Sequence, residues 1–270
     1  MDGHGRTDGN AVNKHQAAER QEWVLPPPLD FSVPYALGDY PEERVRRIMF
    51  KYMERKTNLS RAWARICHHF PETIDAAPLT CLEFGTAHGA MLELWRALGH
   101  GVVGTDFPWR AGKEAVLSPS RPWHRQVLAA CTKQGHGRPL ADPVEGWAYQ
   151  PIIESLDLDV RLIDGRDWPY PFEDKSFDVV CAYQAIDAFA PPERWLEIVS
   201  EFCRIARRAV VVGYNPLPVR QAGDEDRQAA ARAAWLRLQA FSAAGFRTAF
   251  TEFGTTRRGL HPVAMKFLPA

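Results

Sequence analysis

The sequence predicts an α/β fold: a seven-stranded, mostly parallel sheet with helices on both faces, one antiparallel strand in a C-terminal hairpin, and a helical N-terminal addition. Three observations predict it. Apolar runs of strand length alternate with helical patterns between residues 79 and 214, and a pair of strand-like runs closes the chain. A glycine-containing turn also follows the first strand. Such alternation is typical of parallel sheets with helical crossovers, and the closing pair supplies the antiparallel strand.

The chain before residue 79 divides into two parts. Residues 1–22 are polar and lack periodicity, so we expect a disordered tail. Over residues 23–78 we expect an N-terminal helical cap. Its first helix is predicted from Pro41, and its second after Asn58, since apolar positions recur there at helical spacing.

The main domain is expected over residues 79–270. Apolar runs bounded by glycine, proline or acidic residues predict strands at 79–84, 102–107, 159–163, 177–183, 209–214, 246–253 and 263–268. Helical patterns occur at 89–98, 149–156, 192–207 and 224–244. Residues 108–147, which are rich in proline and tryptophan, interrupt this alternation of strands and helices. We interpret them as an insertion that forms a wall of the substrate site or a small core of its own.

Composition restricts the classes of function. Lys plus Arg and Asp plus Glu number 33 each, and this zero net charge makes a nucleic-acid partner unlikely. The five cysteines are scattered without a C-x-x-C pair, so we predict no metal site and a reducing, cytoplasmic location. We see no apolar stretch of membrane-spanning length and no signal peptide, and we expect no membrane span.

The turn Glu83-Phe84-Gly85-Thr86-Ala87-His88-Gly89 is the most informative segment. A dinucleotide site needs glycine at its middle position, where Ala87 stands, because a methyl group there crowds a pyrophosphate. The turn therefore favours S-adenosylmethionine over NAD. Asp106, at the end of the second predicted strand, can accept both ribose hydroxyls of such a cofactor. A plain strand-to-helix turn and a helix-capping acid are the alternative interpretations.

The segment from Asp164 to Val180 adds a third motif, in which "D-G-R-D-W-P-Y-P-F" precedes "S-F-D-V-V". With this motif, residues 79–268 resemble the S-adenosylmethionine-dependent methyltransferases of the Rossmann-like class, and most closely their small-molecule, type 11-like branch. The resemblance implies that Glu83 and 85–89 surround the methionine part and that Asp106 holds the ribose. The implied cofactor-binding residues are Glu83, Gly85, Thr86, Ala87, His88, Gly89, Asp106, Phe107, Asp164, Gly165, Arg166, Tyr183 and Gln184.

The resemblance also implies which residues face the other parts of the cofactor. Asp164, with the backbone of Gly165 and Arg166, would face the adenine, although Asp167 is an alternative because the segment is longer than the common pattern. Tyr183 and Gln184 would lie beside the sulfonium. Methyl transfer depends mainly on alignment and needs no acid/base pair. If the acceptor is a hydroxyl or a protonated amine, a base would help, and the candidates are His88, His124, His136, Tyr183 and Asp187.

The leading hypothesis is methyl transfer from S-adenosylmethionine to an oxygen or nitrogen of a small molecule or glycan. Basic residues of the N-terminal helices would suit an anionic acceptor. Nucleic-acid methylation is weaker, since Ala182-Tyr183-Gln184-Ala185 replaces the Asn/Asp-Pro-Pro-Tyr/Phe motif of adenine methyltransferases. An NAD-dependent dehydrogenase is disfavoured by Ala87, and a relative that has lost activity stays open. The sequence leaves the oligomeric state unknown.

Overall fold

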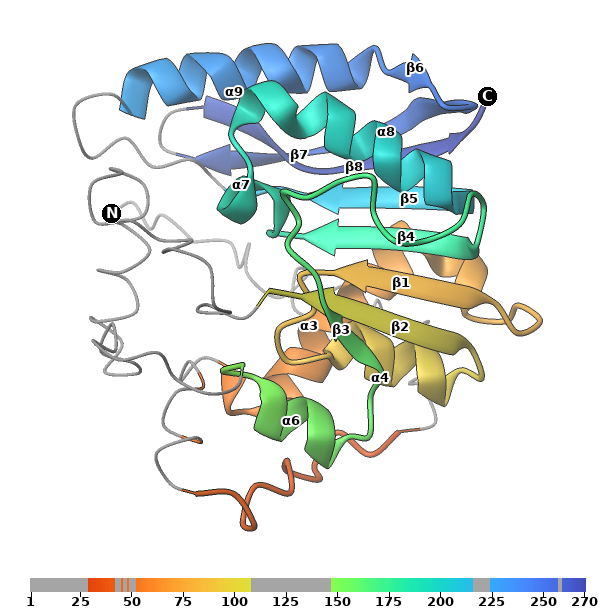
Figure 1. Cartoon of the computed structure of the whole chain (residues 1–270), viewed down its shortest axis with the longest axis vertical. Helices are drawn as coiled ribbons and strands as arrows, with labels where there is room; N and C mark the ends of the chain where they lie inside the picture. The colour runs from red at the N-terminus through yellow and green to blue at the C-terminus, as the bar shows by residue number, and fades with distance from the viewer. Residues whose placement is uncertain are drawn as a thin grey trace, which may run out of the picture.

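A computed structural model describes residues 29–41, 45, 48, 52–107, 147–215, 224–256 and 259–270. Its centre is an eight-stranded sheet in the order β3-β2-β1-β4-β5-β8-β7-β6 (Figure 1). The strands are β1 Thr80–Phe84, β2 Gly101–Asp106, β3 Val160–Leu162, β4 Phe177–Tyr183, β5 Ala206–Gly213, β6 Ser242–Ala243, β7 Phe246–Thr256 and β8 Gly259–Pro269. Strands β3, β2, β1, β4 and β5 pair in parallel, and β8 is antiparallel to β5, which confirms the predicted fold class.

The strand count differs from the prediction because the last predicted helix is shorter than expected. It ends at Gln239, and Ser242 and Ala243 then pair with the start of β7 as a short strand. Ala244 and Gly245 between them both adopt positive φ angles, of 52° and 74°. Two left-handed residues in a row form the tight turn that twisted hairpins prefer, which explains why the chain reverses here instead of continuing the helix.

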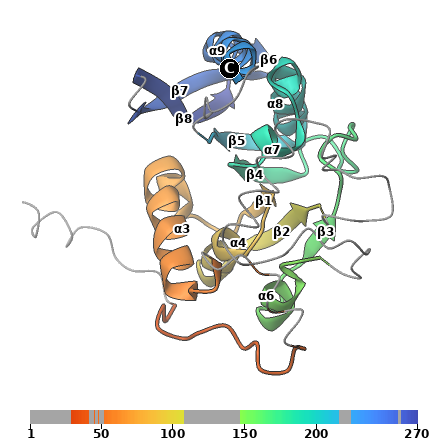
Figure 2. The same ribbon diagram turned by 90° about the vertical axis from the view of Figure 1, so that its left-hand side faces the viewer.

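Helices cover both faces of the sheet (Figure 2). They are α3 Arg55–His69, α4 Ala90–Ala97, α6 Gln150–Ser155, α7 Ile186–Phe189, α8 Trp195–Ile205 and α9 Asp224–Gln239, with short 3₁₀ turns at Pro71–Thr73 and Pro192–Arg194. Side chains alternate between the faces along each strand. Thus Leu82 and Phe84 pack with α8 and α9, whereas Cys81 packs with α3, α4 and α6.

Two element boundaries and one additional helix correct the predictions. Helix α3 begins at Arg55, before Asn58, and Arg55 is buried against Glu93 of α4. The helix predicted at 192–207 ends at Ile205, because Ala206 already pairs with Phe177 at the start of β5. The four-residue helix α7 was not predicted at all.

Several predicted features lie outside the described residues. These are the tail at 1–22, most of the first cap helix and all but the last residue of the insertion at 108–147. The division into tail, cap and main domain therefore stays a prediction. Among the described helices, none combines the length and apolar character needed to cross a bilayer.

Candidate cofactor-binding site

A cavity of about 470 Å³ lies where β1, β2 and β4 end. Helix α3 contributes to its wall through Asn58, Arg61 and Arg65. Most of the predicted cofactor-binding residues line this one cavity: Glu83, Gly85, Thr86, Ala87, His88, Asp106, Phe107, Tyr183 and Gln184. The structure thus brings together residues separated by a hundred positions in the sequence.

The turn after β1 is folded tightly over the end of β2. The backbone N–H groups of Gly85 and Thr86 both donate to the carbonyl of Thr105, at 2.8 and 3.0 Å. Gly85 has a φ of 73°, and a Cβ atom added there would lie 2.5 Å from the Cβ of Ala185. Only glycine fits this conformation and this close approach without strain. The turn therefore keeps the floor of the cavity free of side chains at Gly85.

Asp106 connects the second strand to this turn. Its Oδ2 atom accepts a hydrogen bond from the backbone N–H of Ala87 at 2.8 Å, and its Oδ1 atom accepts one from Phe107 at 2.7 Å. Burial raises the pKa of Asp106 to about 6, against the lowering effect of these two backbone donors. A carboxylate oxygen can accept more than one hydrogen bond, so both oxygens keep capacity for ligand hydroxyls.

Glu83 is a buried acidic residue of the cavity. Its side chain is only 5% exposed, and its Oε2 atom has no hydrogen-bond partner among the described residues. Burial raises its pKa to about 8, the positive charge of Arg65 opposes this rise, and Asp106 adds to it. Buried carboxylate oxygens are normally paired, so an unpaired one that lines a cavity indicates a missing hydrogen-bond donor. A ligand ammonium group would supply that donor.

Arg65 and Tyr183 form the wall beside Glu83. The guanidinium carbon of Arg65 lies 4.5 Å from the centre of the Tyr183 ring, within range of a cation–π interaction. Sequence analysis did not assign several lining residues to the cofactor: Tyr52, Asn58, Arg61, Arg65, Tyr149, Ala185, Ala188 and Phe189. Arg61 and Arg65 carried one signal, because a spacing of four places both on one helical face.

Four predicted residues do not line the cavity. A Cβ atom at Gly89 would lie 2.6 Å from Leu158, so this glycine serves the packing of α4. The carboxylate of Asp164 accepts hydrogen bonds from the backbone N–H and Nε of Arg166, at 3.0 and 2.9 Å. Arg166 and Gly165 lie close to two lining residues instead. The Arg166 guanidinium is 5.7 Å from the ring of Phe107, and a Cβ at Gly165 would lie 2.8 Å from Phe189.

The candidate bases also differ in whether they line the cavity. His88 and Tyr183 line the cavity, whereas Asp187 does not. The Oδ2 atom of Asp187 accepts a hydrogen bond from Asn215 at 2.9 Å, and burial raises the pKa of its carboxyl. His124 and His136 lie outside the described residues.

Comparison with known proteins gives one family match, to the family described as "Methyltransferase domain", over residues 53–256. No curated protein sequence matches the chain. Magnesium protoporphyrin IX methyltransferase from Synechocystis PCC 6803, solved with bound S-adenosylmethionine, is similar over 90% of this chain and 98% of that chain, at 15% identity and a TM-score of 0.44. Streptomyces venezuelae DesVI is similar over 86% of this chain and 100% of that chain, at 15% identity and a TM-score of 0.45.

Proposed function

We propose that this chain, which belongs to the methyltransferase-domain family, transfers the methyl group of S-adenosylmethionine to an oxygen or nitrogen atom of a small molecule or glycan. The chain is thus an S-adenosylmethionine-dependent methyltransferase, and the acceptor is the proposed part. One observation supports the position of the cofactor: Glu83, whose Oε2 atom has no partner in the described part of the chain, and Asp106 line the same cavity.

The charges at the Glu83 end of the cavity suit an amino-acid group. Glu83 would accept hydrogen bonds from the ammonium of the methionine part, and Arg65 would pair with its carboxylate. Both side chains line the cavity, and the charge of Arg65 already acts on the carboxyl of Glu83. Two side chains of opposite charge match the ammonium and carboxylate of an amino acid. They match a diphosphate less well, because a diphosphate carries only negative charge.

The other end of the cavity suits a nucleoside. Asp106 would accept the ribose hydroxyls, since ionised carboxylates are strong acceptors. Phe107 and Phe189 line the cavity beyond it and offer apolar surface for an adenine ring. The Asp164–Arg166 pair would then act indirectly, through the contact of Arg166 with the ring of Phe107.

When bound, S-adenosylmethionine supplies an electrophilic methyl group. The residues of this chain would orient it and exclude water, and such alignment can be worth about 7–11 kcal/mol of the barrier. Tyr183 and Gln184, next to Glu83 in the lining, would face the reacting centre. Arg61, also in the lining, would favour an acceptor with negative charge.

Isothermal titration of the purified chain with S-adenosylhomocysteine tests the cofactor site, and micromolar binding is expected. Absence of heat at millimolar ligand would contradict it. For the acceptor, the chain would be incubated with S-adenosylmethionine and a panel of phenols, sugars and amines. Release of S-adenosylhomocysteine with a member of the panel supports the proposal, and methylation of nucleic acid alone would refute it.

A further inference from the structure

We infer that Tyr183, His69 and Glu252 form a relay that carries the proton of the methyl acceptor out of the cavity. This inference rests on the proposed function and adds the base that it lacks. His69 and Glu252 were not singled out by the sequence. They come from the end of α3 and from the middle of β7, outside the three cofactor motifs.

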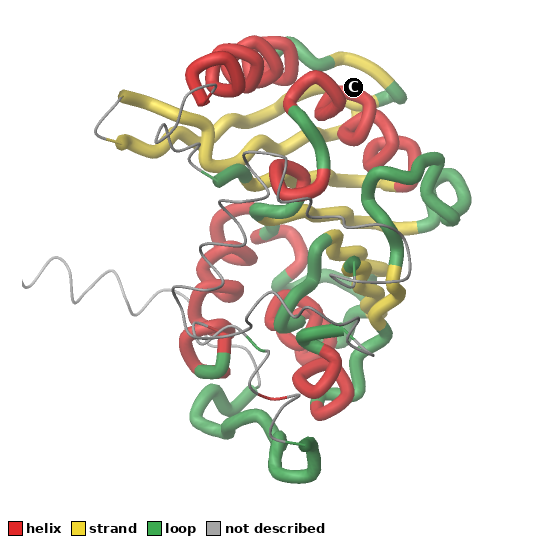
Figure 3. The backbone as a smooth tube through the Cα atoms, turned by 60° about the vertical axis from the view of Figure 1, so that its left-hand side comes forward, coloured by secondary structure: helices red, strands yellow, loops and turns green. Residues whose placement is uncertain are grey.

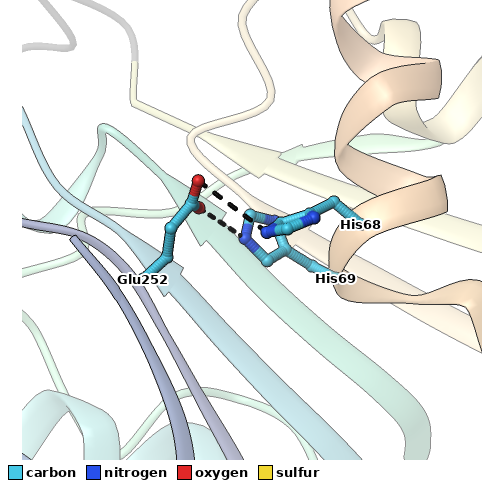
Figure 4. Close-up of side chains that lie close together, drawn as sticks. All are labelled: His68, His69 and Glu252. Carbon is cyan, nitrogen blue, oxygen red and sulfur yellow. Dashed lines mark hydrogen bonds and ion pairs between the residues drawn. The ribbon is translucent and has the colours of Figure 1, made fainter. Parts of the chain in front are cut away.

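Two hydrogen bonds connect the three side chains. The hydroxyl of Tyr183 lies 2.7 Å from Nδ1 of His69, and Nε2 of His69 lies 3.0 Å from Oε2 of Glu252. Figure 4 shows the Glu252 carboxylate facing the His69 ring across the gap between β7 and α3. The long β7–β8 hairpin, which reaches past the neighbouring strands in Figure 3, brings Glu252 to this position.

Burial changes along the relay. Tyr183 lines the cavity and His69 is only 5% exposed, whereas the side chain of Glu252 is 33% exposed. The relay therefore begins at the cavity wall and ends at a carboxylate in contact with water. Two hydrogen bonds thus connect a residue of the cavity wall to an exposed carboxylate, and the inferred relay requires the Tyr183 hydroxyl to be within reach of the acceptor.

The chemistry of the partners fixes the direction of each hydrogen bond. An ionised carboxylate only accepts, so Nε2 of His69 must carry a proton and donate to Glu252. In the neutral ring, Nδ1 then has a free lone pair and accepts from the Tyr183 hydroxyl. Burial lowers the pKa of His69, against the raising effect of Glu252, and the positive charge of Lys266 lowers it further. The neutral imidazole that this pattern of hydrogen bonds requires has its lone pair on Nδ1 and can take a proton there.

Tyr183 could not do this work alone. Burial raises the pKa of its hydroxyl well above the ordinary value, so it does not ionise by itself. As the acceptor oxygen forms its bond to the methyl carbon, the carbon–sulfur bond breaks and its electron pair stays on sulfur. The acceptor proton passes to the oxygen of Tyr183, the tyrosine proton passes to Nδ1 of His69, and the imidazolium is paired with Glu252. Loss of one proton to water restores the neutral ring.

A bound cation is the competing interpretation. The potential ligand atoms of His68, His69 and Glu252 all lie within 4.8 Å of one another. A metal on Nε2 of His69 would force the proton onto Nδ1, which would then donate to Tyr183. His69 could then not accept a proton from Tyr183. The position of the imidazole proton therefore separates the two interpretations.

Nitrogen NMR of the full chain labelled with ¹⁵N-histidine tests the proton position, and the spectrum of His69→Asn identifies the His69 signals. We expect Nε2 protonated and Nδ1 unprotonated at pH 7.5, with or without added EDTA. Glu252→Gln removes the charge that fixes this tautomer, so the Nδ1–H form should appear in that variant. A protonated Nδ1 in the parent, or stoichiometric zinc in the purified protein, would overturn the inference.

Kinetics on the best acceptor of the panel test the function of the relay. Tyr183→Phe and His69→Asn should lower kcat by about 10²–10⁴-fold, the usual contribution of a general base. Both variants should still bind S-adenosylhomocysteine and unfold in one cooperative transition, although each should melt below the parent because it loses a buried hydrogen bond. His68→Asn is the matched control, because His68 is 55% exposed and contacts the same glutamate at 3.8 Å. It should keep the full rate.

Unchanged kcat in folded Tyr183→Phe and His69→Asn would overturn the relay while leaving the proposed function intact. Failure of the proposed function itself would look different, because the parent chain would then not bind S-adenosylhomocysteine.

Discussion

The Oδ2 atom of Asp106 accepts the backbone N–H of Ala87 at 2.8 Å, which ties the end of β2 to the turn after β1. One carboxylate thus shapes the turn and faces the cavity that the turn encloses. Asparagine at this position would keep an acceptor oxygen but lose the charge.

We therefore predict that Asp106→Asn folds but binds S-adenosylhomocysteine about 10–100-fold more weakly, since a hydrogen bond to a charged group contributes about 1.5–3 kcal/mol. Titration calorimetry measures this. Asp178→Asn is the control, because Asp178 also accepts a backbone N–H, from Thr80 at 2.9 Å, at the opposite end of β1. Equal affinity in Asp106→Asn and the parent would contradict the proposed ribose contact.

The raised pKa of Glu83 predicts that cofactor binding depends on pH. With a pKa of about 8, most Glu83 side chains carry a proton at pH 7 in the ligand-free protein. Pairing with a ligand ammonium requires the ionised form, so binding should release a proton and affinity should rise from pH 6 to 8. Glu83→Gln has no carboxyl group to ionise, so this rise in affinity with pH should be absent in that variant. Calorimetry in buffers of different ionisation enthalpy counts the protons, and a parent that releases none would refute the pairing.

The same residue predicts how stability changes with pH. Glu83 ionises near its ordinary value of 4.5 in the unfolded chain but at about 8 in the folded one. The folded state therefore binds the extra proton in this window, and the Glu83 contribution to the free energy of unfolding falls as pH rises through it. Urea unfolding of the ligand-free protein should show Glu83→Gln gaining stability over the parent between pH 5 and 8. A difference in the free energy of unfolding that does not change with pH would disprove this.

Two glycines with a left-handed backbone conformation allow the cost of backbone strain to be measured separately from the cost of a steric clash. Gly85 has a φ of 73° and lies where a Cβ would approach Ala185 to 2.5 Å, whereas Gly99 has a φ of 89° and open space around it. Gly99→Ala should cost about 1–2 kcal/mol, the strain of a left-handed residue. Gly85→Ala should cost more and also weaken cofactor binding. Equal losses of stability in thermal melts, with binding unchanged, would show that Gly85 does not shape the cavity.

A buried ion pair holds α3 onto α4. Arg55 and Glu93 are 6% and 4% exposed, and the Nε–Oε1 distance is 3.0 Å. Removing one partner should cost about 3–5 kcal/mol, because it leaves a buried charge uncompensated. Urea unfolding of Arg55→Met should show this loss, and the double variant Arg55→Met/Glu93→Leu should recover part of it. If the double variant is no better, the loss in Arg55→Met reflects packing instead of charge.

The sequence predicted the parts of the fold that local patterns specify. Strand β4 was predicted to the residue, since its apolar run is bounded on both sides. The end of α8 was not, because Ala206 and Arg207 suit a helix locally and become strand only by pairing with their neighbours. Such long-range pairing overrides weak local preference.

For the site too, the sequence predicted the residues that local patterns specify and not those that long-range packing brings in. Glu83, Asp106 and the turn follow strand ends, so the rule that ligands bind beyond the carboxyl ends of parallel strands identified them. Arg65, His69 and Glu252 lie on a helix and a hairpin whose packing no local pattern encodes. The Asp164 motif was recognised, but its acid accepts a hydrogen bond from Arg166, whose guanidinium lies 5.7 Å from the ring of the lining residue Phe107.

The account depends on where the cofactor lies, and a crystal structure of the full chain with S-adenosylhomocysteine tests this most directly. We predict that the ribose hydroxyls lie within hydrogen-bond distance of the Asp106 carboxylate and that the ammonium lies at Oε2 of Glu83. Ligand density elsewhere, or a ligand in this cavity that contacts neither carboxylate, would contradict it.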